Sequence, residues 1–183
     1  LPASDFPTVE DIRSQQTLTL TAEALHKLLE KTHFSMAQQD VRYYLNGMLL
    51  EFDGKRLRSV ATDGHRLAYC ECDAEASGGG HQVIVPRKGV LELQRLLRPE
   101  GKVEVLIGSS HIRAQIGDIR FTSKLIDGRF PDYSRVIPPA PPRVISAQKE
   151  PLRTALQRAA ILSNEKYRGI RLTLKPQLLQ LQA

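Results

Sequence analysis

The sequence resembles itself at a distance of about 125 residues, and this internal repeat limits most strongly how the chain can fold. A segment that ends in Phe-Pro occurs at 1–7 and again at 125–131. After each copy come a short alternating strand, an amphipathic helix, a polar loop and a strand that begins with Gly. Generic alternation of strands and helices is the alternative explanation. The repeat predicts an excerpt from an array of units of about 125 residues, which is ordinary domain size.

The helices of the repeat follow from apolar spacing. In the first, Leu25, Leu28 and Leu29 are spaced i, i+3, i+4, and Thr21 is available as the N-cap. In the second, an apolar stripe follows a proline that is tolerated in the first turn. That stripe consists of Leu152, Ala155, Leu156 and Ala159, after Pro151.

The repeat also predicts the domain organisation. The absence of an initial Met agrees with a chain that begins inside a longer protein. The predicted segments are 1–16 as the tail of a preceding unit and a linker, 17–135 as one complete unit, 136–143 as a Pro-rich linker, and 144–183 as the start of a third unit.

Turn signals divide the complete unit into short strands. Asp53-Gly54 joins two apolar-rich runs as a hairpin, and Asp63-Gly64 interrupts the next pair. The remaining predicted elements are strands at 81–85, 103–107, 112–116 and 119–125 and a helix at 87–97. About eight antiparallel strands with two helices predict an α+β unit that carries its helices on one side of the sheet.

Composition excludes several classes of protein. Apolar residues make up 41% and charged residues 25%, as in ordinary globular proteins, and no apolar run reaches the length of a membrane span. Cys70 and Cys72 alternate on a predicted strand without zinc-like spacing, so we interpret them as structural thiols and expect no metal site. The net charge of +6 is compatible with a polyanionic partner.

An enzyme is not indicated. Asp63 and His65 could form an acid–base pair, with Ser59 or Ser123 as a nucleophile, but no known catalytic spacing supports this. We therefore expect no catalytic residues and no cofactor. A basic adaptor of another fold, which binds nucleic acid without encircling DNA, is a better candidate than an enzyme.

Five stretches carry a family resemblance. They are Asp40–Leu49 (DVRYYLNGML), Val60–Leu67 (VATDGHRL), Val83–Gly89 (VIVPRKG), Asp127–Tyr133 (DGRFPDY) and Leu162–Lys166 (LSNEK). Together they resemble the β subunit, or β sliding clamp, of bacterial DNA polymerase III, in order and over essentially the whole chain. A high pI of about 9.5 departs from the acidic exterior of such clamps.

The resemblance implies a DNA-clamp fold, with antiparallel sheets and two helices in each repeated domain. Family members are non-enzymatic, cytoplasmic processivity factors whose three-domain protomers pair as a homodimer ring around double-stranded DNA. The implied partners are the DNA polymerase III catalytic subunit, the clamp loader and other proteins with a clamp-binding motif. No membrane is involved. This chain would hold the end of the first domain, the whole second domain and the start of the third.

By the same resemblance, a cleft between the second and third domains captures partner peptides. Its matching positions are Leu45, Thr62, Gly64, His65, Arg66, Leu67, Pro131, Arg135 and Val136. Apolar members can form walls for peptide anchors, and the arginines can orient peptide carbonyls or acidic groups. Asp63-Gly64 is also explained as a simple tight turn. The family cleft uses further residues from the end of the third domain, so this chain alone should bind peptides weakly.

DNA contact and subunit contact are implied at two further sets of positions. DNA contact falls on Gln39, Arg42, Tyr43, Arg87 and Lys88, and the dimer interface on Ile161 and Leu162. Ordinary strand packing of Tyr43 and a solvated helix start at Arg87-Lys88 are the alternatives. A cationic pair at a helix N-terminus opposes the helix dipole, which favours a functional reason for it. Ile161 and Leu162 could instead continue the buried stripe of their helix.

Overall fold

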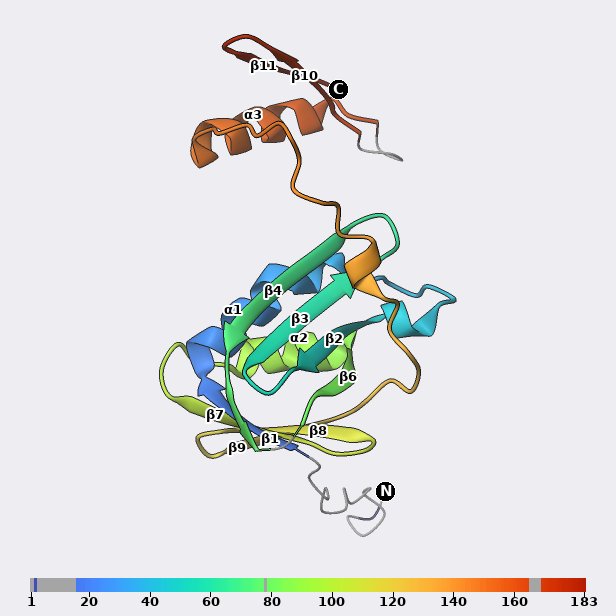
Figure 1. The fold of residues 1–183 in the computed structure, drawn as a ribbon, viewed down its shortest axis with the longest axis vertical. Helices are drawn as coiled ribbons and strands as arrows, with labels where there is room; N and C mark the ends of the chain where they lie inside the picture. The colour runs from blue at the N-terminus through green and yellow to red at the C-terminus, as the bar shows by residue number, and fades with distance from the viewer. Residues whose placement is uncertain (1, 3–15, 78, 165–168) are drawn as a thin grey trace. The chain divides into compact units, whose positions relative to one another are not determined.

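The computed structural model describes residues 2, 16–77, 79–164 and 169–183. The predicted tail and linker at 1–16 therefore lies almost wholly outside the described residues. The chain divides into two compact units, one that ends at Asp132 and one that runs from Tyr133 to Ala183 (Figure 1). Each unit is described by itself below.

The described part of the first unit alternates short strands with two α-helices and two 3-10 helices. Its elements are β1 (Gln16–Thr21), α1 (Ala22–Thr32), η2 (His33–Ser35), η3 (Tyr43–Leu45), β2 (Gly47–Phe52), β3 (Arg56–Thr62), β4 (Leu67–Asp73), β5 (Glu75–Ser77), β6 (His81–Pro86), α2 (Arg87–Leu96), β7 (Lys102–Ile107), β8 (His111–Ile116) and β9 (Ile119–Lys124).

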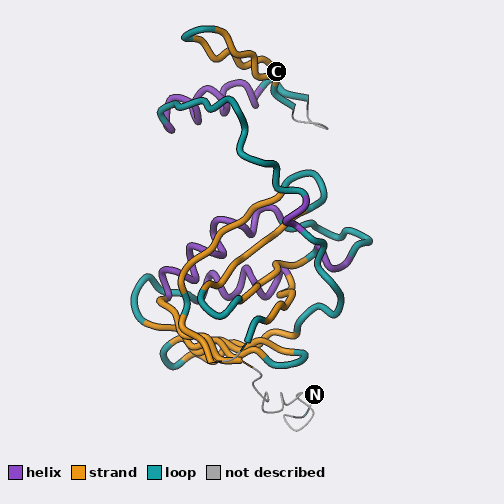
Figure 2. Tube along the Cα trace, in the orientation of Figure 1, coloured by secondary structure: helices purple, strands orange, loops and turns teal. Residues whose placement is uncertain are grey.

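These strands form two antiparallel sheets, with the orders β5-β1-β7-β8-β9 and β4-β3-β2-β6. The helix α1 packs against β3 and β4, and α2 packs against β2 and β6, so both helices cover one face of the four-stranded sheet (Figures 1 and 2). The predicted α+β class with antiparallel sheets and two helices is confirmed. The division into two sheets was not foreseen, because strand alternation does not reveal which strands pair.

The first helix forms as its sequence predicts. Thr21 is the N-cap, and its Oγ1 accepts a hydrogen bond from the backbone N–H of Ala24 at 3.1 Å. Leu25, Leu28 and Leu29 are each 1% exposed, so the predicted stripe is the buried face. The cap satisfies a backbone donor that would otherwise have no partner, and the stripe anchors the helix to the core.

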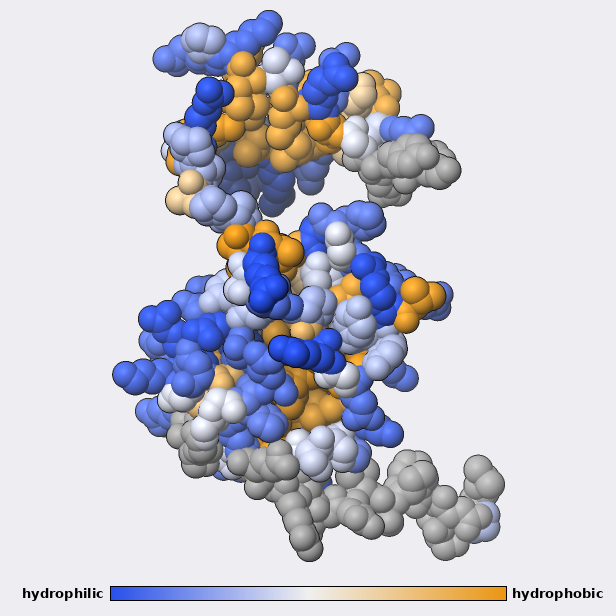
Figure 3. All heavy atoms as spheres, turned by 45° about the vertical axis from the view of Figure 1, so that its right-hand side comes forward, coloured by the Kyte–Doolittle hydropathy of each residue, from blue (hydrophilic) through white to orange (hydrophobic). Residues whose placement is uncertain are grey.

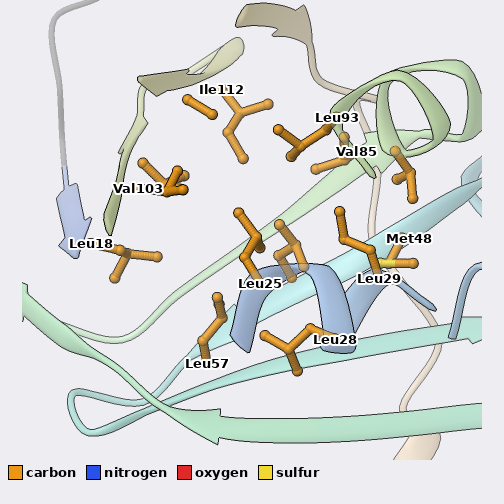
Figure 4. Close-up of a cluster of buried hydrophobic side chains, with 14 of the residues drawn as sticks. Leu18, Leu25, Leu28, Leu29, Met48, Leu57, Val85, Leu93, Val103 and Ile112 are labelled. Carbon is orange, nitrogen blue, oxygen red and sulfur yellow. The ribbon is translucent and has the colours of Figure 1, made fainter. Parts of the chain in front are cut away.

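The main core lies between the two helices and the two sheets. Leu18 of the five-stranded sheet, Met48 of the four-stranded sheet, Leu25 of α1 and Leu93 of α2 point into one cluster (Figure 4). All four are at most 2% exposed. Burial of apolar area from four elements at once makes this cluster the main stabilising contact of the unit.

A second apolar layer lies on the opposite face of the four-stranded sheet. Leu49 is buried although its neighbours Met48 and Leu50 point into the main core, and Ile84, its partner across β6, is also buried. Leu49, Ile84 and the buried ring of Phe130 line one surface cavity. The chain that follows β9 is therefore fixed to the sheet, with the N–H of Ile126 donating to the carbonyl of Ile84 at 2.9 Å.

The second unit is smaller and more open. It contains η4 (Tyr133–Arg135), α3 (Lys149–Ile161) and an antiparallel hairpin of β10 (Arg171–Lys175) and β11 (Leu178–Gln182). The predicted helix and the strand after it are thus confirmed. The short alternating strand predicted before this helix, at 144–146, is wrong, because these residues are exposed and form no regular structure. Among its described residues no side chain is fully buried, and apolar side chains gather on its surface (Figure 3). No described helix of either unit is long and apolar enough to cross a membrane.

Candidate functional site

The turn between β3 and β4 is held by its own side chains. Thr62 Oγ1 accepts from the N–H of Gly64 at 3.1 Å and donates to the carbonyl of Arg66 at 2.7 Å. Asp63 Oδ1 accepts from the N–H groups of His65 and Arg66, both at 3.0 Å. These bonds order the turn (residues 62–67) while the side chains of His65 and Arg66 stay exposed. It is a rigid surface feature of the kind that binding sites use.

Arg66 ties this turn to the segment that follows α1. Its Nε donates to Asp63 Oδ2 at 3.1 Å, and its Nη2 donates to the carbonyl of Phe34 at 2.7 Å. The guanidinium carbon lies 5.8 Å from the centre of the Phe34 ring, within the range of a cation–π contact. Phe34 is 50% exposed, so an aromatic ring and an oriented cation lie side by side at the surface.

The loop from residue 38 to residue 46 is closed by one asparagine. Asn46 Oδ1 accepts from the N–H of Asp40 at 2.9 Å, and Asn46 Nδ2 donates to the carbonyl of Asp40 at 2.9 Å. Gln39 has a φ of 56°, in the left-handed region, and its side chain is exposed. The loop is thereby fixed in one shape, with Gln39 and the 95% exposed Val41 toward solvent.

Arg42 connects this loop with the turn. Its Nε and Nη2 donate to the two carboxylate oxygens of Asp40 at 3.0 and 2.8 Å, and Nη2 lies 3.4 Å from the carbonyl oxygen of Asp63. The guanidinium also fills the space beside Gly64, where an added Cβ would lie 3.0 Å from Nη2. Hydrogen bonding from Arg42 lowers the pKa of Asp40 to about 2. A residue predicted to contact DNA thus touches the predicted peptide wall.

The other residues predicted to contact DNA surround the same loop. Tyr43 is 57% exposed and packs edge-on against Tyr44, with ring centres 5.8 Å apart. Arg87 donates its N–H to the carbonyl of Asn46 at 3.0 Å, and its Nη1 lies 3.4 Å from the carbonyl oxygen of His33. Lys88 is exposed in the first turn of α2. The structure therefore brings together residues from η3, the loop and the start of α2.

The predicted peptide-cleft residues are placed unequally. Leu45 is only 2% exposed, whereas Leu67 is half-buried. Pro131 is exposed in the last segment of the first unit. Arg135 and Val136 belong to the second unit, where both are exposed.

The predicted subunit-contact residues end the helix of the second unit. Ile161 is 80% exposed and Leu162 is 83% exposed. Among the described residues of this unit neither side chain is buried, and the subunit contact stays a prediction.

Three supporting residues were missed by the sequence reasoning. Asp40, Asn46 and Phe34 organise the loop and the turn, as described above. The short spacing of Asp40 and Arg42 could have indicated an ion pair. No local signal marks Phe34, since its partner Arg66 lies far along the chain.

Comparison with known proteins decides the family. Residues 19–132 match the family model described as DNA polymerase III beta subunit, central domain, and residues 134–183 match the C-terminal domain of the same subunit. The chain belongs to the DNA polymerase III beta subunit family.

Relatives of this beta-subunit chain are similar over its whole length. The beta sliding clamp of Pseudomonas aeruginosa is 57% identical and that of Escherichia coli K12 is 54% identical, each over 100% of this chain and 50% of the relative. A crystal structure of the Pseudomonas aeruginosa subunit superimposes with a TM-score of 0.95 at 57% identity, again over 100% of this chain and 50% of that one. Another, bound to griselimycin, gives 0.93 at 56%, over 99% and 50%. The chain thus spans about half the length of the curated relatives it matches.

Proposed function

We propose that this chain is part of a sliding clamp, a non-catalytic processivity factor that encircles double-stranded DNA and tethers polymerase and other partners. The observation that carries the proposal is the family match, which runs in order through a central domain and into a C-terminal domain. The described structure adds an ordered turn and an ordered loop at the matching positions. The clamp acts in the cytoplasm, where the DNA is.

The turn 62–67 is one wall of a surface that docks partner peptides. His65 and Arg66 are exposed recognition groups on a backbone held by Thr62 and Asp63. A pre-ordered cation beside an exposed ring suits a peptide that carries both carbonyl acceptors and an apolar anchor. Pro131, Arg135, Val136 and the buried Leu45 complete our proposed set.

The loop 38–46 and the start of α2 face DNA. Gln39, Tyr43 and Lys88 are exposed, and Arg87 is half-buried. Such side chains contact the phosphate backbone. Its charge does not depend on the DNA sequence, so the protein can slide along the duplex.

Two assembly features belong to the same proposal. The complete central domain covers 17–135, a Pro-rich linker covers 136–143, and 144–183 opens the third domain. Ile161 and Leu162 pack against another protomer in the ring, which gives two strongly exposed apolar side chains a partner.

Griselimycin binding tests the docking surface, because a related clamp has been solved with this ligand. Isothermal titration calorimetry would compare the wild-type chain with Leu67→Ala and with Leu91→Ala. Leu91 is the matched control, since it is 37% exposed on α2, which carries none of the proposed peptide-contact residues. We expect Leu67→Ala to weaken binding about tenfold, as for a loss of about 1.4 kcal/mol, and Leu91→Ala to leave it unchanged. Equal affinities of all three proteins, or no binding by the wild type, would refute the docking surface.

The salt dependence of DNA binding tests the second surface. Fluorescence anisotropy would follow duplexes of different sequence at several salt concentrations. We expect equal affinities for all sequences, and a slope of log K against log salt that Lys88→Ala makes shallower by about 0.9. A preference for one sequence, or an unchanged slope in Lys88→Ala, would contradict backbone contact at the start of α2.

A further inference from the structure

The guanidinium of Arg42 is shared between the DNA-facing loop and the peptide-facing turn. On one side it forms a two-pronged ion pair with Asp40, which itself belongs to the loop. On the other side it fills the space above Gly64 and reaches the carbonyl of Asp63. Displacement of this one side chain therefore changes both surfaces.

A DNA phosphate that binds the Nε–Nη2 edge of Arg42 alters this arrangement. Nε and Nη2, which form one edge of the guanidinium fork, are both occupied by Asp40. Nη1 lies toward the turn, 3.1 Å from the position that a Cβ on Gly64 would take. A phosphate that takes the fork must displace the carboxylate of Asp40.

Removal of the guanidinium gives the turn more freedom at Gly64, while the hydrogen bonds of Thr62 and Asp63 remain. Gly64 has a φ of 88° and no side chain of its own, so the guanidinium is the packing contact on that side of the turn. His65 and Arg66, the exposed recognition groups, follow it directly. Greater freedom in the turn raises the entropic cost of ordering these groups when a peptide binds.

We propose that Arg42 is a positioning residue that couples the two surfaces negatively. DNA phosphate draws Arg42 away from Asp40 and Gly64, and the loosened turn then binds its peptide ligand more weakly. By thermodynamic linkage, a bound peptide ligand weakens DNA contact at this loop by the same factor. The inference rests on the proposed function, since it needs both surfaces to bind their ligands.

The test measures griselimycin affinity with and without DNA. Calorimetric titrations of the wild-type chain would be run alone and with a saturating short duplex. We expect DNA to weaken griselimycin binding about fivefold, at the lower end of usual coupling factors. In Arg42→Ala the two affinities should be equal, although both ligands still bind. A simple steric clash between DNA and griselimycin would persist in this variant, which would overturn the role of Arg42.

Two further variants sharpen the result. Lys88→Ala removes an exposed cation outside the turn, so DNA should bind more weakly. Once DNA is saturating, it should still weaken griselimycin binding about fivefold, as in the wild type. Asp40→Asn weakens the ion pair, so griselimycin affinity should fall at a lower DNA concentration than in the wild type. Loss of the effect in Lys88→Ala would overturn the specific role of Arg42.

The outcomes separate the inference from the proposed function. If both ligands bind the wild type and neither affects the other, the coupling is overturned and the clamp function stands. If griselimycin or duplex DNA fails to bind at all, the proposed function of that surface is overturned, and the coupling with it. Backbone NMR signals of Gly64, His65 and Arg66 should shift on addition of DNA in the wild type and stay in place in Arg42→Ala.

Discussion

Arg66 donates from Nη2 to the carbonyl of Phe34 at 2.7 Å and at the same time places its guanidinium 5.8 Å from the centre of the Phe34 ring. The β3–β4 turn is thereby joined to the segment after α1. An arginine that is 60% exposed would otherwise sample many rotamers. Because three contacts hold it, it can meet a ligand with little further loss of side-chain entropy.

Replacement of Arg66 should therefore affect binding more than stability. Exposed ion pairs contribute at most about 1 kcal/mol, so Arg66→Ala should lower the free energy of unfolding by less than that. Griselimycin affinity should fall about tenfold, and Arg66→Lys should not restore it, since lysine lacks the planar fork. Urea denaturation and calorimetry would measure the two effects. Arg98→Ala, which alters an exposed arginine after α2, is the control. Full affinity in Arg66→Lys would show that charge alone matters.

Gly64 and Gly54 permit a matched comparison of two turns. Both have positive φ, of 88° and 100°, but only Gly64 has a neighbour within 4 Å of an added Cβ, namely Arg42. Alanine at either position should destabilise the chain by about 1 kcal/mol through backbone strain. Only Gly64→Ala should displace Arg42 and so raise the pKa of Asp40, as followed by carboxyl NMR. An equal Asp40 pKa in both variants would contradict this contact.

Asp40 should titrate at an unusually low pH. Hydrogen bonds and charge from Arg42 lower its pKa from 3.8 to about 2. Because the folded-state pKa lies below the unfolded value, its stabilising contribution is present above about pH 4 and is lost as the pH falls toward about 2. In Arg42→Ala, the pKa of Asp40, measured by carboxyl NMR, should return toward its ordinary value. The pKa of Asp53 is lowered chiefly by hydrogen bonds from the backbone N–H groups of Arg56 and Lys55, so it should be unchanged in the same variant.

Phe130 should anchor the chain that leaves the first unit. Its ring is 7% exposed and lines a cavity with Leu49 and Ile84, so Phe130→Ala should cost about 3 kcal/mol of unfolding free energy. Phe34→Ala, at a ring that is 50% exposed, should cost less than about 1 kcal/mol. Hydrogen exchange at the N–H of Ile126 should speed up in the first variant alone. Unchanged protection there would show that the segment is held by other contacts.

Cys72 should react slowly while the chain is folded. Burial raises the pKa of its thiol to about 11, so at pH 8 only about one thiol in a thousand is the reactive thiolate. Alkylation by iodoacetamide, followed by mass spectrometry, should be far slower than in urea. Cys72→Ser assigns the modified position, because Cys70 is then the remaining thiol. Equal rates in the folded and unfolded chain would contradict the burial.

Local sequence determined the elements of this protein well. Thr21 and the leucine stripe from Leu25 to Leu29 specify α1, because capping and burial of one helical face act within a few residues. Asp53-Gly54 and Asp63-Gly64 specify their turns, since Asp side chains cap nearby N–H groups and Gly accepts a positive φ. The same strand and helix patterns predicted the α+β class.

Tertiary structure alone decided how those elements become a surface. Leu45 is on a matching site position, yet packing buries it, and an apolar residue carries no local mark of which face will be covered. The strands divide into two sheets because pairing is set by the common core and not by strand order. Arg42 was expected to meet DNA, and folding places it on Asp40 and Gly64 as well. That contact depends on bringing two loops together, and it could not be predicted from either loop by itself.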